Sequence, residues 1–402
     1  MTARQNIEQW FNIVITWLTE YLRRFLDGIQ ALRSLTIPYR EEIRVNFGKL
    51  RIFMVPTLNI GVVYYRMENF VNEMRALGHQ VAYRYHPPEY AGTCQWEHNL
   101  TDKVIQEYEN LMNVADIAIF QAVHTPQSLA VVQGIRDVFK KPVLAEYDDD
   151  IFAVSSENLS YKTTQPGGDT EWYNKCQIQQ SDGTIVSTDY LKKRYRSFNK
   201  RIFVIPNAID FKIWDSAKRG KEHKRIRIGW VGGASHSGDL RLVKDAIYKL
   251  LDRHGNIEIY FHMGGLPEEW MLGRPRFHAF HKWFTIDKYP QGFAKYNFDI
   301  GIAPLRDTEF NRSKSNLRFL EFSALKIPTV CSRMETYEHD IEHGKNGLLA
   351  RESEEWFNCL DYLIKNEKAR KKMGRRAYDY VKKRYNVQRA TKKYIYTLRQ
   401  YL

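Results

Sequence analysis

Apolar residues recur every three or four positions between residues 6 and 33, which predicts an amphipathic helix ahead of the first domain. The helix is expected to end at Thr36-Ile37-Pro38, because the residue before a proline disfavours helical backbone. Packing against the body or a partner subunit, and so a possible oligomer contact, is the main interpretation. In-plane association with a membrane, with Trp and Arg23/Arg24 at the interface, is the alternative.

From residue 50 onward, short apolar runs alternate with helical patterns in two successive series, which is typical of parallel strand–helix–strand units. The expected strands of the first series are Leu50–Val55, Val81–Tyr85, Ile117–Phe120, Val143–Glu146, Thr184–Ser187 and a last one within Arg201–Asp210. Those of the second are Ile226–Val231, Ile257–His262, Ile300–Ala303 and Thr329-Val330. A basic, helical tail follows from Ser353.

These patterns predict an α/β protein with an N-terminal helix and lead-in (1–48) and a first Rossmann-like domain (49–210). A solvated linker (211–224), a second Rossmann-like domain (225–385) and a C-terminal helix (386–402) complete the expected order. Two domains are also what the length implies, since 402 residues exceed what one hydrophobic core usually organises.

Composition adds a strong positive charge to this picture. The formal net charge is +14, which should attract a polyanion such as a nucleic acid, an anionic membrane surface or a phosphorylated substrate. The four cysteines lie far apart and lack metal-ligand spacing, so they predict reduced thiols: Cys94, Cys176, Cys331 and Cys359. The sequence shows neither a membrane-spanning run nor a secretory signal, and a cytoplasmic protein, or one peripheral at a membrane, is expected.

The first candidate for ligand chemistry is the turn Gly229–Leu240. An apolar strand ends there in Gly232 and Gly233, and a helix with Asp239 as its expected N-cap follows. Glycines let the backbone approach a diphosphate, and a helix N-terminus offers free N–H groups. The spacing fits neither G-x-G-x-x-G nor a P-loop. A tight turn without ligand is the alternative interpretation.

The second candidate is the segment Phe310–Glu321. Arg312, Lys314 and Arg318 form a cationic set at an expected helix start near Ser313, suited to pyrophosphate oxygens. Glu321, two turns further, could accept both hydroxyls of a ribose. A solvated basic helix start with a paired, buried glutamate is the alternative. Both candidates follow strands of one parallel sheet, where ligands bind beyond the carboxyl ends, so together they predict a nucleotide diphosphate site.

Several motifs of the second half occur in a fixed order: Val204–Asp210, the Gly232-Gly233 turn, Asp299–Leu305, Leu320–Val330 and Asn346–Leu349. Over roughly Arg201–Tyr385 this order resembles the donor domain of GT-B glycosyltransferases, specifically the retaining glycosyltransferase family 4. The resemblance implies GT-B architecture, with two Rossmann-like parallel-sheet domains facing a cleft, and a hexosyltransferase-like enzyme. It also implies a UDP- or GDP-sugar donor, no tightly bound cofactor and no required metal.

Carried over by position, Glu321 matches the second glutamate of the family's E-x7-E signature, which binds the donor ribose, and Ser313 stands where the first glutamate would be. The family's usual Arg and Lys on the donor phosphates come from the loop after the first strand of this domain. Here that loop offers Gly233 and His236, and Arg312, Lys314 and Arg318 are the expected replacement charge.

The first domain should then hold the acceptor. Its distinctive feature is Glu146-Tyr-Asp-Asp-Asp150 at a strand end, where crowded carboxylates can raise a pKa. Asp148 and Asp150, with His124 past another strand, are the candidate catalytic residues, either as a base or for orienting an acceptor hydroxyl. A metal site of oxygen ligands is the alternative for the acidic run, and a surface histidine for His124.

The resulting hypothesis is transfer of a sugar, with retention, to a glycan or lipid-linked saccharide at an anionic membrane surface. In such a reaction the donor phosphate can accept the acceptor's proton, and domain closure would exclude water. A modified base in nucleic acid is the rival acceptor. A catalytically degenerate nucleotide-sugar-binding subunit is the non-enzymatic alternative.

Overall fold

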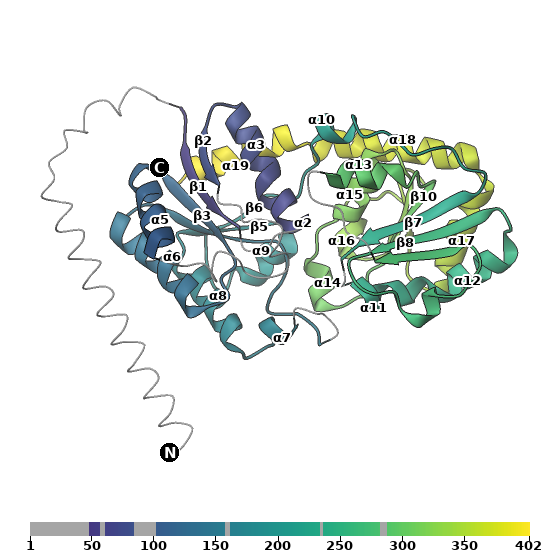
Figure 1. Ribbon diagram of the computed structural model, residues 1–402, viewed down its shortest axis with the longest axis horizontal. Coiled ribbons are helices and arrows are strands. Elements are labelled where there is room, and N and C mark those ends of the chain that lie inside the picture. Colours follow the sequence, from purple (N-terminus) through teal and green to yellow (C-terminus); the bar gives the residue numbers. More distant parts are fainter. Residues whose placement is uncertain (1–47, 57–60, 84–101, 157–160, 234–235, 282–287) are drawn as a thin grey trace, which may run out of the picture. The chain divides into compact units, whose positions relative to one another are not determined.

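The computed structural model describes residues 48–56, 61–83, 102–156, 161–233, 236–281 and 288–402. The chain separates into a unit of residues 1–49 and a unit of residues 50–402, and all that follows concerns the second (Figure 1). The predicted amphipathic helix at residues 6–33 and Cys94 lie outside the described residues.

The first sheet is parallel throughout and has six strands in the order β2-β1-β3-β4-β5-β6. We call the part of the chain built on it the first lobe. Its strands are β1 (Arg51–Val55), β2 (Gln80–Tyr83), β3 (Ile117–Gln121), β4 (Val143–Tyr147), β5 (Gly183–Val186) and β6 (Ile202–Val204). Its helices are α2 (Gly61–Val63), the π-helical turn η2 (Tyr64–Glu68), α3 (Asn69–Ala76), α5 (Asp102–Val114), α6 (Pro126–Phe139), α7 (Tyr161–Thr164), α8 (Asp169–Gln180) and α9 (Asp189–Tyr195).

The second sheet, which defines the second lobe, is also six-stranded and parallel, in the order β12-β11-β10-β7-β8-β9. After α10 (Phe211–Trp214) its strands are β7 (Ile226–Gly232), β8 (Ile257–Met263), β9 (Phe277–His281), β10 (Ile300–Ala303), β11 (Thr329–Ser332) and β12 (Leu348–Ala350). Its helical elements are α11 (Ser237–Leu240), η5 (Arg241–Val243), α12 (Lys244–Arg253), η6 (Glu269–Met271), α13 (Tyr289–Lys295), α14 (Glu309–Ser313), α15 (Leu317–Ala324), α16 (Glu335–Glu338), α17 (Ser353–Lys365) and α18 (Glu367–Arg384).

Most strand residues are buried on both faces of each sheet, with edge strands such as β2 and β9 as the exceptions. In β1, Ile52 and Met54 pack with one apolar cluster, whereas Phe53 and Val55 pack with another, as the two-residue period of a strand requires. The first cluster includes side chains of α3, and the second includes side chains of α5 and α6, which Figure 1 shows beside the sheet. This explains why the strands appear in the sequence as continuous apolar runs.

The last helix, α19 (Val387–Arg399), follows α18 but packs in the first lobe. Its Val387, Tyr394 and Leu398 are fully buried in the cluster that holds Ile52 and Phe70. Backbone hydrogen bonds from Ile209 N to Tyr385 O (2.8 Å) and from Val387 N to Ile209 O (3.0 Å) join the two places where the chain passes between lobes. The C-terminal helix is therefore part of the core of the first lobe.

Two local expectations were wrong. Asp239 does not cap a helix, since it lies inside α11, where His236 is the N-cap residue. No helix starts near Ser313; α14 ends there and α15 starts at Leu317, so Glu321 lies about one turn into its helix. Within the described residues, no helix combines the length and the apolar character that crossing a membrane requires.

Candidate functional site

The candidate donor residues lie at the topological switch point of the second sheet. The strand order reverses between β7 and β10, which pair directly, and ligands of open parallel sheets bind beyond the carboxyl ends of such strands. Gly232 ends β7, and the segment that carries Lys314, Arg318 and Glu321 follows β10. Two stretches about 80 residues apart in sequence are thus attached to neighbouring strand ends, as the sequence predicted.

Gly232 has a structural reason for being glycine. A Cβ atom there would lie 2.3 Å from the ring of Trp230, which is fully buried. The packing of this indole against the backbone therefore excludes larger residues at position 232, independently of any ligand. Gly233 follows immediately and is partly buried.

Asp239 joins the loop after β7 to the loop after β10. Its Oδ2 lies 2.9 Å from His236 Nδ1, and its Oδ1 accepts hydrogen bonds from Arg306 N (3.0 Å) and Asn311 Nδ2 (2.8 Å). These bonds, with the neighbouring cations, hold the pKa of Asp239 below its usual value, although burial acts in the opposite sense. The residue expected to cap a helix thus fixes two loops of the site to each other.

His236 is held as a neutral imidazole. Burial lowers its pKa, and the charges of Lys314 and Arg318 lower it further, against the opposing effect of Asp239. Because Nδ1 faces the Asp239 carboxylate, it carries the proton in this arrangement, and Nε2 keeps its lone pair. Such a nitrogen accepts a hydrogen bond, so it suits a sugar hydroxyl better than a phosphate oxygen.

The three predicted cations, Arg312, Lys314 and Arg318, do not form one cluster. Lys314 is only 11% exposed; its Nζ lies 3.4 Å from Asp149 Oδ2 of the first lobe and 4.5 Å from the centre of the Phe310 ring. Arg312 has a side chain that is 48% exposed and pairs through two contacts with Asp307, at 2.6 and 3.1 Å. Lys314 is therefore placed near the first lobe, whereas Arg312 is engaged at the surface.

Glu321 is fully buried and accepts hydrogen bonds from side chains of both lobes. Tyr65 Oη of the first lobe donates to Oε1 at 2.9 Å, and Arg318 donates to Oε2. Arg318 also donates to Tyr289 Oη at 3.0 Å. Burial, followed by the charge of Glu321, raises the pKa of Tyr65 well above its usual value, which keeps this hydroxyl a donor. Neither tyrosine was predicted, because nothing in the surrounding sequence marks it.

In the acidic run of the first lobe, Glu146 is part of a buried network. Its two carboxylate oxygens accept hydrogen bonds from Arg66 Nε (2.6 Å) and Gln121 Nε2 (2.7 Å). Arg66 also donates to Ile205 O (2.6 Å) and Asn207 Oδ1 (3.0 Å). Because both partners of the ion pair are buried and hydrogen-bonded, the pair is structural, and it fixes the carboxyl end of β4.

Asp148 differs from its neighbours. Its side chain is partly buried, and in the described part of the chain no hydrogen bond or ion pair reaches its carboxyl. Burial, followed by the charges of Asp149 and Glu146, raises its pKa to about 8, against the opposing effect of Arg66 and Lys314. At neutral pH this carboxyl is mostly protonated, and it is available to a ligand.

Asp150, the other predicted carboxylate, is fully buried and occupied. Its Oδ1 accepts from Phe152 N (3.1 Å) and its Oδ2 from Arg194 Nε (3.0 Å). Burial raises its pKa, and the charge of Arg194 opposes the shift. The structure therefore gives Asp150 a role in holding the loop after β4.

The contacts of Ser313 explain why no glutamate stands at the first position of the E-x7-E signature. Its Oγ accepts from Asp150 N (3.0 Å) and donates to Phe310 O (2.7 Å), while its carbonyl accepts from Thr188 Oγ1 (3.1 Å). The residue is fully buried where the lobes touch, and a glutamate there would lose these bonds and bury a charge.

His124 follows β3 as predicted, and burial lowers its pKa to about 4, so its imidazole is neutral at physiological pH. Across the described ranges, no group of three His, Cys, Asp or Glu side chains could hold a metal ion.

Comparison with known proteins gives this geometry a context. Residues 245–395 match the family model described as Glycosyl transferase-like. No curated protein matches the sequence. The structure is similar to sucrose-phosphate synthase from Thermosynechococcus elongatus, with 12% identity over 87% of this chain and 98% of that one, and a TM-score of 0.61.

Two further similar structures contain nucleotides. HepE from Anabaena in complex with UDP-glucose shares 13% identity over 88% of this chain and 100% of its own, with a TM-score of 0.61. The catalytic domain of starch synthase IV from Arabidopsis thaliana, bound to ADP and acarbose, shares 10% identity over 88% and 99%, with a TM-score of 0.59. At such identities the similarity establishes the fold, and it confirms the predicted GT-B architecture of two Rossmann-like parallel-sheet lobes.

Proposed function

We propose that this chain, which has the GT-B fold and whose residues 245–395 match a glycosyl transferase-like family model, transfers a sugar, with retention, from a UDP- or GDP-sugar to a hydroxyl of a glycan or lipid-linked saccharide. The observation that carries the proposal is the meeting of two sets of residues at the carboxyl ends of the sheets. Lys314, Arg318, Glu321 and His236 come from the second lobe, and the available carboxyl of Asp148 comes from the first.

On the donor side, Glu321 would accept the ribose hydroxyls, and Lys314 and Arg318 would neutralise the diphosphate. Lys314 is the better placed cation, because the one ion pair it makes within the described residues is a long one, with Asp149 at 3.4 Å. His236, as a neutral acceptor, would bind a hydroxyl of the transferred sugar. The UDP-glucose in HepE and the ADP in starch synthase IV support a nucleotide-sugar donor for this fold.

Transfer with retention requires no strong protein nucleophile. The departing phosphate can accept the acceptor's proton, while the cations stabilise the charge that develops on the diphosphate. Asp148 would orient the acceptor hydroxyl by a hydrogen bond, a role that suits a partly buried carboxyl to which none of the described residues donates a hydrogen bond. The configuration of the product, read by NMR of the anomeric proton, tests this assignment, and an inverted product would contradict it.

Thermal-shift measurement with UDP and GDP is the first test of the donor site. Wild type should be stabilised by one of them, and Lys314→Ala should lose most of the shift. Arg312→Ala is the matched control, because this nearby cation is engaged by Asp307 at the surface. No shift with any nucleoside diphosphate, or equal loss in both variants, would overturn the site as assigned.

Turnover separates an enzyme from a binding subunit. Wild type should slowly hydrolyse its donor in the absence of acceptor, and Glu321→Gln should reduce this rate. A protein that binds the donor yet never turns it over, with any glycan acceptor, would favour the catalytically degenerate subunit instead.

A lipid-linked acceptor places the enzyme at an anionic membrane, and α18 supports this location. Its exposed face carries five cations for which the structure shows no ion pair, and their spacing places them on one side of the helix: Lys368, Lys372, Arg375, Arg376 and Lys383. The opposite side is buried through Met373, Ala377 and Val381. Attraction of such a stripe to acidic lipid is worth about 1 kcal/mol per cation near the surface.

Binding to vesicles of acidic phospholipid should therefore be strong at low salt and weak at high salt, since screening acts on exposed charges. Replacing Lys368, Lys372 and Arg375 by glutamine should reduce it, and the same change at three exposed cations that already have partners, Lys345, Lys365 and Lys371, is the control. Tight binding to DNA without vesicle binding would instead favour the nucleic-acid acceptor.

A further inference from the structure

The hydrogen bond between Tyr65 and Glu321 joins the two lobes at the residue that the proposed function assigns to the ribose. Tyr65 is 1% exposed and Glu321 is fully buried. The bond, at 2.9 Å, connects residues 256 positions apart. Together with Arg318 on the other oxygen, it supplies each oxygen of the carboxylate with a donor from the chain itself.

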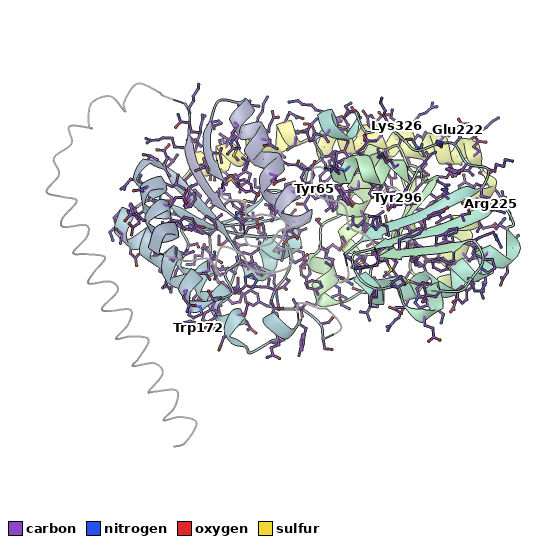
Figure 2. The ribbon with its side chains drawn as sticks, viewed as in Figure 1. Tyr65, Trp172, Glu222, Arg225, Tyr296 and Lys326 are labelled. Atoms are coloured by element: carbon purple, nitrogen blue, oxygen red, sulfur yellow. The ribbon has the colours of Figure 1, made fainter. Side chains whose placement is uncertain are left out.

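The position of Tyr65 depends on a local irregularity of the first lobe. The tyrosine, which is labelled in Figure 2, lies in η2. In this π-helical turn the amide of Asn69 donates a hydrogen bond to Tyr64 O. Four successive residues of this turn are buried, so its side chains point in different directions into protein. Tyr65 extends to Glu321, whereas the next residue, Arg66, bonds to Glu146 at the end of β4. Such π-helical turns are frequent at functional sites.

The side chain of Tyr65 is embedded in the second lobe. Tyr64 and Tyr65 belong to the same apolar cluster as Phe293, Phe319 and Leu320 of the second lobe. No part of Glu321 is exposed to solvent. A ligand can therefore reach the carboxylate only if a side chain bound to it moves, and Tyr65 is the one that the first lobe contributes.

A ribose hydroxyl and a tyrosine hydroxyl are the same kind of donor to a carboxylate. We infer that Tyr65 occupies the place of a ribose hydroxyl on Glu321, so that binding of a nucleoside diphosphate exchanges one hydroxyl for the other. The inference rests on the proposed role of Glu321. Without Tyr65 the empty enzyme would bury a carboxylate with one donor fewer, which is costly. Tyr65 thus stabilises the empty site and competes with the donor nucleotide for it.

The test is UDP binding, or GDP binding if thermal shift selects GDP, measured by calorimetry on wild type and Tyr65→Phe. The phenylalanine keeps the ring but cannot donate, so the nucleotide no longer displaces a bond and should bind about tenfold more tightly, as expected of one hydrogen bond to a charged group. Unliganded Tyr65→Phe should also melt below wild type. Unchanged or weaker nucleotide binding by Tyr65→Phe would overturn the inference.

Tyr394→Phe is the matched control. It also removes a buried hydroxyl in the first lobe, but this hydroxyl has no hydrogen-bond partner in the part of the chain that the structure describes. Its nucleotide affinity should equal that of wild type. Glu321→Gln separates a failure of the ribose assignment from a failure of the exchange with Tyr65. If it binds the nucleotide as wild type does, the ribose assignment fails; if it binds weakly while Tyr65→Phe is unchanged, only the exchange fails.

Discussion

At the scale of single residues, the site depends on which carboxylates already have hydrogen-bond or ion-pair partners within the protein. Glu146 and Asp150 are bonded to Arg66 and Arg194, which lie 80 and 44 positions away in sequence. Asp148, between them in the chain, has no such partner among the residues that the structure describes, and burial raises its pKa to about 8. The sequence shows an acidic run at a strand end, but the distant arginines that separate structural carboxylates from an available one are visible only in the fold.

Asp148→Asn should increase stability at alkaline pH. In the unfolded chain an aspartate ionises near pH 4, whereas in the folded chain Asp148 stays protonated up to about pH 8. The folded state therefore binds more protons between these values, so this contribution to stability is lost progressively as the pH rises from about 4 to about 8. The asparagine stays neutral throughout, so its advantage should be small at pH 5, grow through pH 7 and level off at about 2 °C in Tm near pH 9.

Melting curves of both proteins at pH 5, 7 and 9 test this expectation. Asp379→Asn on the exposed face of α18 is the control, and its difference from wild type should not grow with pH in this way. A constant difference for Asp148→Asn across the three pH values would contradict the raised pKa.

At the scale of elements, the predicted strands are confirmed in type and order, because continuous apolar runs follow from burial on both faces. Ile300–Ala303 is found with the predicted bounds, whereas β9 and β12, at the two edges of the second sheet, were missed. The break between α14 and α15 could not be predicted either. Asn316 at this break donates to Asp340 (2.6 Å), and Asp340 also accepts bonds from tyrosines near the end of α18, so tertiary contacts set this helix start.

Gly232→Ala tests why β7 ends in glycine. The added Cβ would force the buried ring of Trp230 to move, and such overpacking costs about 1–3 kcal/mol. The loss should appear in denaturant unfolding without any nucleotide present. Gly255→Ala is the control, since no atom lies within 4 Å of a Cβ at that position and its backbone tolerates a side chain. Equal stability of the two variants would mean that the glycine is kept only for a ligand.

At the scale of the whole chain, the two α/β series and their order were predictable, and so was the attachment of two segments of the second series to the carboxyl ends of strands in one sheet. The contacts that residues of one lobe make with residues of the other were not predictable. Tyr65 on Glu321, Ser313 on Asp150 and Asp149 on Lys314 join residues from different series, and no periodicity or motif relates them. These contacts become visible only when both lobes are folded and packed against each other.

Removing residues 386–402 should damage the first lobe more than the second. The deletion takes Val387, Tyr394 and Leu398 out of the cluster that holds β1 and α3, whereas the clusters of the second lobe lose no member. Limited proteolysis of the truncated protein should therefore cut first within residues 50–204 and leave a fragment that starts near residue 211. Preferential cleavage in the second series would contradict this division of the core.

The same placement of α19 has a consequence for biosynthesis. The strands of the first lobe leave the ribosome before the second lobe is made, but one apolar face of their sheet is completed only by α19, within residues 386–402. The second lobe, made later, has its clusters complete once α18 has emerged. The first lobe, whose sheet is made before the second lobe, is thus completed after it, and a nascent chain would expose part of that sheet face to chaperones until α19 has emerged.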